Sequence, residues 1–119
     1  MKKAPVKIAV PTNDGENIFK GMLGRASNFY IYEINDKGDF RLLETRANPY
    51  EKTLQHLKTL DVYELIKDCS VVVAAKIGKN GIERLKERGV TLIIKEGHIV
   101  DNLEKLIQNK QFSYTSFAD

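Results

Sequence analysis

The spacing of hydrophobic positions changes once along the chain, at Asn48–Pro49. Before that point, the apolar residues form short segments rich in β-branched and aromatic side chains, which predicts strands over Lys7–Val10, Phe29–Ile34 and Phe40–Arg46. The turn-forming residues Pro11–Gly15 should end the first strand, and residues 16–28, which have no clear period, are predicted as a loop. The glycine within Asn35–Asp39 permits a tight hairpin, so the second and third strands are expected to be antiparallel.

After Pro49 the spacing becomes helical. Apolar residues recur three or four positions apart from Leu54 to Cys69, which predicts a helix there, with Asp61 as an internal break or a second N-cap. The run Ser70–Ala75 is typical of a strand that is covered on both faces. The remaining pattern predicts a helix over 80–88 that ends at Gly89, a strand over 90–94, and a helix over 100–107 capped by Asp101 or its neighbours.

This order of elements predicts a specific sheet. The strands that are joined through helices are expected to be parallel neighbours with right-handed crossovers, while the first three strands form a meander. A five-stranded mixed sheet in the order 3-2-1-4-5, with only strand 2 antiparallel, satisfies every connection. Helices would cover both faces, which is the three-layer arrangement of a ribonuclease-H-like α/β fold.

Composition limits the class of protein. A chain of 119 residues that is 42% hydrophobic and 29% charged predicts one domain over 1–119, with a core over about 6–107 and a tail over 111–119 that either docks on the body or stays loose. The longest apolar run, Val71–Ala75, is far shorter than the roughly 20 residues of a membrane span, and the N-terminal segment has no signal-peptide pattern. A single cysteine, Cys69, cannot form an internal disulfide. We therefore expect a cytoplasmic protein with no membrane partner.

The predicted topology places a candidate site at one edge of the sheet. In open α/β sheets, ligands bind beyond the carboxyl ends of the parallel strands where the winding reverses, here between the first and fourth strands. The loops that reach this point carry polar, basic and glycine residues. The candidate ligand-binding residues are Asn13, Arg25, Ser27, Asn48, Lys76, Gly78, Lys79 and Asn80, and the candidate metal ligand is His98.

The turn Lys76–Gly81 suits an anionic ligand. It joins a buried strand to a helix, so free backbone N–H groups and the positive end of the helix dipole would face the site, beside two lysines. The alternative is an ordinary turn with solvated lysines. The turn lacks the G-x-x-x-x-G-K-[ST] pattern of nucleotide triphosphatases. Residues 76–88 hold five basic and two acidic residues, a net charge of +3 that equals the formal charge of the whole chain, and this local surplus fits a small anion better than a nucleic acid.

Three candidate side chains each have a second interpretation. Arg25 could bind a carboxylate or phosphate-like group through its planar guanidinium, or it could form an ion pair with Asp14 or Glu16. Asn80 could contact a ligand or cap its helix. His98 could bind a metal or lie solvated in its loop.

The sequence does not favour catalysis. A two-metal nuclease on this fold needs clustered carboxylates, but the first and fourth predicted strands contain none, and Asp14 stands alone at the predicted edge. Cys69 is expected to be a buried small residue at the opposite end of the sheet, which excludes a Cys–His pair at the site. We therefore predict a protein without enzymatic activity.

Several short segments, taken in order, carry a family resemblance: Lys7–Thr12, Gly24–Ala26 before an aromatic strand, Asn48–Pro49, Val71–Ala75 followed by Ile77–Gly78, Leu85 and Gly89–Val90. Over about residues 6–107 the chain resembles the dinitrogenase iron-molybdenum cofactor biosynthesis family, whose members are similar to nitrogenase accessory factors. Many relatives carry a His-Phe-Gly-Arg-like segment where this chain has Met22–Arg25, and a Gly-rich stretch where it has Tyr50–Thr53.

The resemblance implies a ribonuclease-H-like domain that carries an iron-sulfur or iron-molybdenum cofactor precursor and works with cofactor-assembly proteins. Together with the basic turn, it predicts a small non-catalytic carrier that holds an anionic ligand. The exposed edges at the third and fifth strands permit either a monomer or a weak homodimer. The alternative is a regulatory or interaction domain of the same fold that has lost cluster binding, and a metal-dependent nuclease is the less favoured third possibility.

Overall fold

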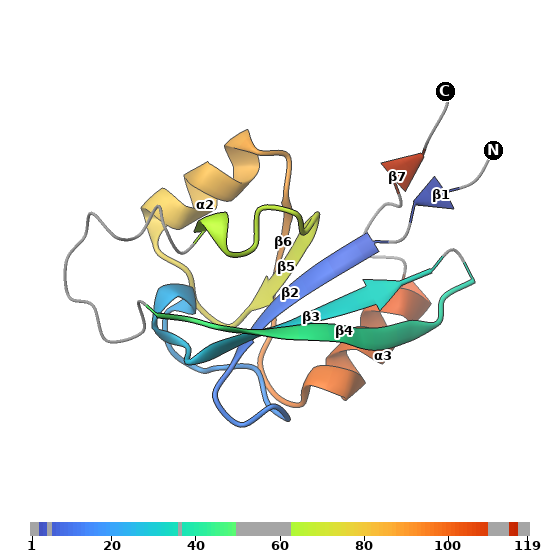
Figure 1. Ribbon diagram of the computed structural model, residues 1–119, viewed down its shortest axis with the longest axis horizontal. Coiled ribbons are helices and arrows are strands. Elements are labelled where there is room, and N and C mark those ends of the chain that lie inside the picture. Colours follow the sequence, from blue (N-terminus) through green and yellow to red (C-terminus); the bar gives the residue numbers. More distant parts are fainter. Residues whose placement is uncertain (1–2, 5, 36, 50–62, 110–114, 117–119) are drawn as a thin grey trace.

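One mixed sheet carries the fold, with five strands in the order β4-β3-β2-β5-β6 (Figure 1). The structure is a computed structural model that describes residues 3–4, 6–35, 37–49, 63–109 and 115–116. β3 is antiparallel to β2 and β4, whereas β2, β5 and β6 are parallel to one another, so the predicted order and the single antiparallel strand are confirmed. The strands are β2 (Val6–Thr12), β3 (Asn28–Ile34), β4 (Phe40–Ala47), β5 (Val71–Ala74) and β6 (Thr91–Ile94).

Strand β2 runs two residues past its predicted end, through Pro11 to Thr12. The Pro11 carbonyl accepts a hydrogen bond from the Phe19 N–H (2.8 Å), on the side of the strand away from β3. The nitrogen and the oxygen of one strand residue point the same way, so the missing N–H of Pro11 also lies away from β3. The proline therefore costs the β2–β3 ladder no hydrogen bond, and the turn signal at Pro11 does not end the strand.

Two described helices follow parallel strands close to their predicted bounds: α2 (Lys79–Glu87) after β5 and α3 (Ile99–Asn109) after β6. Gly89, with φ of +73°, lies just past the end of α2, as predicted. Asp101 lies in the first turn of α3 rather than at its cap, where its charge still favours the helix dipole. No helix in the described ranges is long and apolar enough to span a membrane.

The helix predicted from Leu54 to Cys69 falls mostly on residues 50–62, which lie outside the described residues. Its last part is described: Tyr63 and Glu64 are helical, and residues 65–68 form a turn. A short 3₁₀ helix, η1 (Leu23–Arg25), interrupts the predicted loop over 16–28.

The sheet has a hydrophobic cluster on each face. Neighbouring residues of a strand point to opposite faces, so β2 contributes Val6, Ile8 and Val10 to one cluster and Ala9 to the other. On the first face, α3 packs through Ile99, Leu103 and Leu106. On the second face, α2 and the segment before β5 pack through Leu85, Tyr63, Ile66 and Cys69. Helices therefore cover both faces, and Figure 1 shows α2 and α3 on opposite sides of the central strands.

Cys69 is 2% exposed, within the cluster below α2. Burial raises the pKa of its thiol to about 12, so the side chain is a neutral thiol at physiological pH. The expectation that Cys69 is a buried small residue is confirmed.

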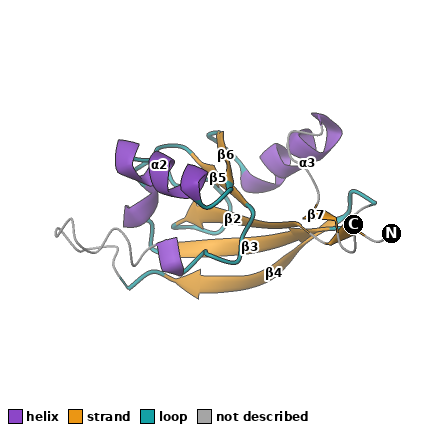
Figure 2. Cartoon of the chain, turned by 90° about the horizontal axis from the view of Figure 1, so that it is seen from above, coloured by secondary structure: helices purple, strands orange, loops and turns teal. Residues whose placement is uncertain are grey.

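Strand β4 forms one edge of the sheet and lies along the side of the molecule farthest from α2 and α3 in Figure 2. Its pairing with β3 shifts by one residue: Ile31 pairs with Glu44, and Tyr32 pairs with Leu42. Leu43 is the extra residue of this β-bulge.

The two ends of the chain form a separate pair of strands. β1 (Lys3–Ala4) pairs antiparallel with β7 (Thr115–Ser116), so part of the tail docks beside the N-terminal segment.

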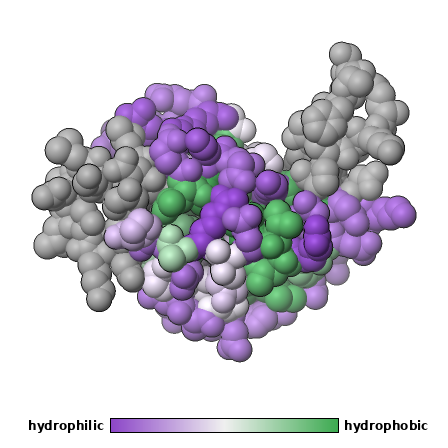
Figure 3. Space-filling model, viewed as in Figure 1, coloured by the Kyte–Doolittle hydropathy of each residue, from purple (hydrophilic) through white to green (hydrophobic). Residues whose placement is uncertain are grey.

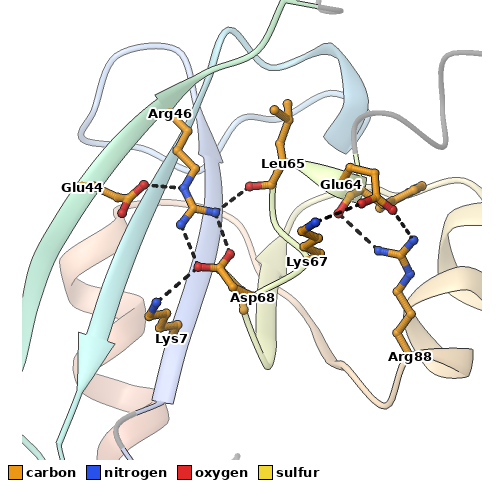
Figure 4. A network of polar contacts seen from close by, with 10 residues as sticks. Lys7, Glu44, Arg46, Glu64, Leu65, Lys67, Asp68 and Arg88 are labelled. Carbon is orange, nitrogen blue, oxygen red and sulfur yellow. Dashed lines mark hydrogen bonds and ion pairs between the residues drawn. The ribbon is translucent and has the colours of Figure 1, made fainter.

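An ion-pair network joins β4 to the turn before β5 (Figure 4). The Arg46 guanidinium donates to both carboxylate oxygens of Asp68, at 2.7 and 2.8 Å, and also to Glu44 and to the Leu65 carbonyl oxygen. Lys7 lies 3.2 Å from the same Asp68 carboxylate. Bidentate geometry makes this a well-defined attachment of residues 65–68 to the sheet. Beside it, Arg88, the C-cap residue of α2, forms an ion pair with Glu64 at 2.8 Å.

We expect the Asp68 carboxylate to make stability depend on acidity. Arg46, and then Lys7, hold its pKa below the ordinary value, so between the folded and unfolded pKa values the unfolded chain binds more protons. The contribution is therefore complete above the ordinary aspartate pKa of about 3.9 and is lost as the pH falls below it. Asp68→Asn should lower the free energy of unfolding at pH 7 by about 1 kcal/mol, because the site is partly exposed.

Urea unfolding at pH 7, 4 and 3 tests this expectation. The difference between Asp68→Asn and the unaltered chain should shrink as the pH falls through this range. Asp39→Asn, at an exposed hairpin position with no ion pair among the described residues, is the control and should behave like the unaltered chain. A difference for Asp68→Asn that is the same at all three pH values would contradict the expectation.

Candidate functional site

The segment between β2 and β3 crosses the carboxyl ends of the parallel strands and is anchored on both faces of the sheet. Ile18, 1% exposed, belongs to the α3-side cluster, and Leu23, 1% exposed, belongs to the α2-side cluster. Backbone hydrogen bonds fix both anchors: Ile18 N–H donates to the Gly97 carbonyl and Leu23 N–H to the Lys76 carbonyl, each at 2.9 Å. This segment is therefore bonded to the residues that follow both β5 and β6, at the edge where the switch point was predicted.

Four of the predicted residues lie around η1. The side-chain oxygen of Asn13 accepts hydrogen bonds from the Ser27 backbone N–H (2.7 Å) and hydroxyl (3.1 Å). Asn48, 3% exposed, donates through its side-chain amide to the carbonyl oxygens of Gly24 (3.0 Å) and Ala26 (2.8 Å). These bonds hold the backbone on both sides of Arg25. Asn13, Ser27 and Asn48 thus act on the shape of the loop, and only Arg25 presents an exposed charged side chain.

The Arg25 side chain forms no ion pair with any described residue. Its alternative partner Asp14 is engaged elsewhere: its carboxylate accepts from the backbone N–H groups of Asn17 (2.8 Å) and Glu16 (2.9 Å). These bonds, led by that of Asn17, hold the pKa of Asp14 well below its ordinary value. The interpretation of Arg25 as the partner of Asp14 or Glu16 is therefore not supported.

The turn after β5 lies beside η1. Met22 forms a parallel bridge with Lys76, and a side-chain carbon placed on Gly78 would lie 3.2 Å from the Met22 Cε. Gly78 is the N-cap of α2 and provides no side-chain cap, and the first intrahelical bond runs from the Ile82 N–H to the Gly78 carbonyl at 3.0 Å. The N–H groups of the first turn therefore precede the helical ladder.

The expectation that Asn80 caps α2 is wrong, because the helix begins one residue earlier at Lys79. The cap residue Gly78 has an extended backbone, as N-cap residues usually do. Asn80 instead lies exposed in the first turn, next to Lys79.

His98 lies apart from this group, on the α3 side. It pairs with Asn17 in an isolated antiparallel bridge, and its carbonyl accepts from the Asn102 N–H at 3.1 Å. Its imidazole Nδ1 lies 4.0 Å from the Asp101 carboxylate, and the side chain is 44% exposed. An open hollow near it is lined by Asn13, Asp14, Asn17, Ile18, Phe19, Lys20 and Gly97.

Positive charge gathers on the α2 side. Hydrophilic residues cover α2 in the space-filling view (Figure 3). Lys76, Lys79, Arg84 and Lys86 form no ion pair with a described residue, whereas Arg88 bonds Glu64. Of these four, Lys76 and Lys79 lie at the amino end of α2, and Arg84 and Lys86 lie in its last turn. The backbone at Lys76 is bonded to Leu23 of η1, the short helix that contains Arg25.

The chain matches the dinitrogenase iron-molybdenum cofactor family model over residues 4–109. The chain belongs to this family. The match covers the whole five-stranded sheet, α2 and α3.

Solved structures similar to this family member share its fold. The crystal structure of a protein named PH0822 is 23% identical and covers 87% of this chain and 91% of its own, with a TM-score of 0.72. The apo orange protein of Desulfovibrio gigas is 16% identical, with 96% of each chain covered and a TM-score of 0.68. A candidate NifB protein from Thermotoga is 21% identical, with 96% and 97% covered and a TM-score of 0.63. No curated protein matches the sequence.

The sequence did not indicate two residues that shape the α2 side of the site, Leu23 and Tyr63. Leu23 lies in a segment without periodicity, so nothing marked it as an anchor. The sequence pattern places Tyr63 only within the predicted helix, although its ring lies against the first turn of α2 at Gly81. The only available signal was a glycine at a helix start, which usually indicates a turn rather than a close contact.

Proposed function

We propose that this family member is a non-catalytic carrier that holds an anionic iron-sulfur or iron-molybdenum cofactor precursor as cargo, at the amino end of α2. The observation that carries the proposal is the combination of family membership with an uncapped helix start next to unpaired cations. Arg25 and Lys79 would bind the anionic cargo by charge and hydrogen bonding, and the free N–H groups of α2 would add backbone donors. Cofactor-assembly proteins would be the partners that deliver and accept the cargo.

The available donor atoms favour charge and hydrogen bonding over coordination. Among the described residues, no three His, Cys, Asp or Glu side chains are grouped so as to hold a metal ion. Cys69 is buried and its pKa is raised, so it is a poor thiolate ligand. His98 is a single imidazole on the α3 side. The cargo would thus be held as an intact anion and released without breaking bonds to protein ligands.

Removal of single positive charges tests this proposal. Anaerobic incubation with iron and sulfide, followed by gel filtration, should yield iron that elutes with the protein. We expect Arg25→Ala and Lys79→Ala each to weaken binding about tenfold, the effect of one charge-assisted contact. Lys86→Ala is the matched control, because it removes the same charge from the far end of the same helix.

If all three variants bind the same amount of iron, general positive charge rather than a defined site attracts the anionic iron-sulfur species. Absence of bound iron in the unaltered chain, with molybdate also unbound, would contradict the carrier proposal. The second candidate, a regulatory or interaction domain, would then be favoured by the segment Met22–Arg25, in which apolar residues stand where many relatives are expected to have histidine and phenylalanine. Magnesium- or manganese-dependent cleavage of an RNA–DNA hybrid would instead support the nuclease alternative.

A further inference from the structure

The Tyr63 side chain reaches the first turn of α2. A side-chain carbon placed on Gly81 would lie 1.9 Å from the Tyr63 hydroxyl oxygen and 3.0 Å from the ring carbon that bears it. The hydroxyl is thus the part of the ring nearest to the helix. Gly81 is the third residue of α2, so its N–H is one of those that precede the helical ladder.

Tyr63 is nearly buried as a residue, but its hydroxyl has no hydrogen-bond partner among the described residues. The residue is 5% exposed, and among the described residues no donor or acceptor forms a hydrogen bond with this hydroxyl; only the backbone carbonyl of Tyr63 is bonded, by Arg88 and Ile66. A hydroxyl without a protein partner must be satisfied from outside, because leaving it unpaired in the interior would be costly. No fully enclosed side-chain polar atom in the described residues lacks a partner, so this oxygen retains an opening to the outside.

We propose that the Tyr63 hydroxyl is a ligand-binding group that donates a hydrogen bond to an anion held at the amino end of α2. This inference rests on the proposed function and adds to it a neutral donor on the inner side of the site. Arg25, Lys76 and Lys79 supply charge from the exposed side, while Tyr63 approaches from the core. Gly81 is required because any side chain there would occupy the position of the hydroxyl.

The surroundings keep Tyr63 in the donor form. Burial raises the pKa of its hydroxyl, so it carries its proton at neutral pH. The ring packs in the same cluster as Leu23 and Leu85, which limits its rotation. A fixed donor loses little freedom when it binds an anion, and a donor in an apolar setting is stronger than one in water.

Titration with molybdate, a small oxoanion, tests the inference by calorimetry and by the amide resonances of residues 78–81. We expect Tyr63→Phe to weaken molybdate binding about tenfold, which corresponds to one hydrogen bond to a charged group. Tyr32→Phe is the matched control: Tyr32 is 6% exposed but lies in the α3-side cluster, and its affinity should change less than about twofold.

The outcomes separate this inference from the proposed function. If Lys79→Ala weakens binding but Tyr63→Phe matches Tyr32→Phe, Tyr63 is not a ligand and the carrier proposal stands. If the unaltered chain binds neither molybdate nor iron with sulfide, both proposals are wrong. Should Tyr63→Phe fail to fold, the ring ¹³Cζ resonance of Tyr63 in the unaltered chain decides, because it must shift on addition of molybdate; no shift would overturn the inference.

Discussion

Gly81→Ala should destabilise the protein by about 2 kcal/mol, although the same change within an exposed helix usually stabilises by 0.5–1 kcal/mol. The added methyl group would lie 1.9 Å from the Tyr63 hydroxyl oxygen and 2.8 Å from the Ile77 Cγ1. Neither neighbour can move freely, because Tyr63 is buried and Ile77 packs against the same cluster. Steric overlap therefore outweighs the gain in helix propensity.

Urea unfolding of Gly81→Ala, Tyr63→Phe and the double variant measures the coupling. Removal of the hydroxyl oxygen leaves the nearest ring atom at 3.0 Å, so Gly81→Ala should cost less than half as much in the Tyr63→Phe background. If the losses of stability in Gly81→Ala and Tyr63→Phe simply add in the double variant, the Tyr63 hydroxyl oxygen is not the atom that overlaps the added methyl group. A Gly81→Ala protein more stable than the unaltered chain would mean that Tyr63 does not pack against α2.

Leu23→Ala should lower the free energy of unfolding by about 3 kcal/mol, the usual cost of removing most of a buried leucine side chain. Leu23 is 1% exposed and attaches η1, which contains Arg25, to the α2-side cluster. We also expect anion binding to weaken, because η1, which contains Arg25, loses its apolar attachment to the α2-side cluster. The Leu23 N–H, which bonds the Lys76 carbonyl, should then exchange faster with solvent.

Ile18→Ala provides the control, since Ile18 is equally buried but attaches the same segment to the α3-side cluster. Its cost in stability should be similar, while the exchange of the Leu23 N–H and the binding of molybdate should stay close to those of the unaltered chain. Equal losses of binding in both variants would show that affinity follows overall stability rather than the position of η1.

The strand order could be predicted because few topologies satisfy the connections. The hairpin at Asn35–Asp39 requires antiparallel neighbours, and crossovers through helices require parallel ones. Once those constraints are combined, the loops that reach the carboxyl ends follow directly. This is why Asn13, Ser27 and Asn48 were correctly expected near one another.

The roles of those residues could not be predicted, because they depend on where individual hydrogen bonds form. Asn48 was expected to face a ligand, yet its amide bonds two carbonyl groups of the η1 segment. The path of residues 16–27 was also beyond prediction, since its two apolar anchors, Ile18 and Leu23, are five positions apart and lie on opposite faces of the sheet. No single period describes such a segment.

The bulge at Leu43 has a consequence for how molecules of this protein meet in solution. The bulge makes the spacing of backbone hydrogen-bonding groups along β4 irregular, and the charged residues Arg41 and Glu44 are exposed on the same strand. A second strand would therefore pair poorly with β4. Both features discourage the open-ended growth of sheets that leads to aggregates. Each edge strand carries one exposed large apolar side chain, Leu42 (45%) on β4 and Ile94 (53%) on β6, so the bulge and the charged residues beside it, rather than apolar exposure, set the β4 edge apart.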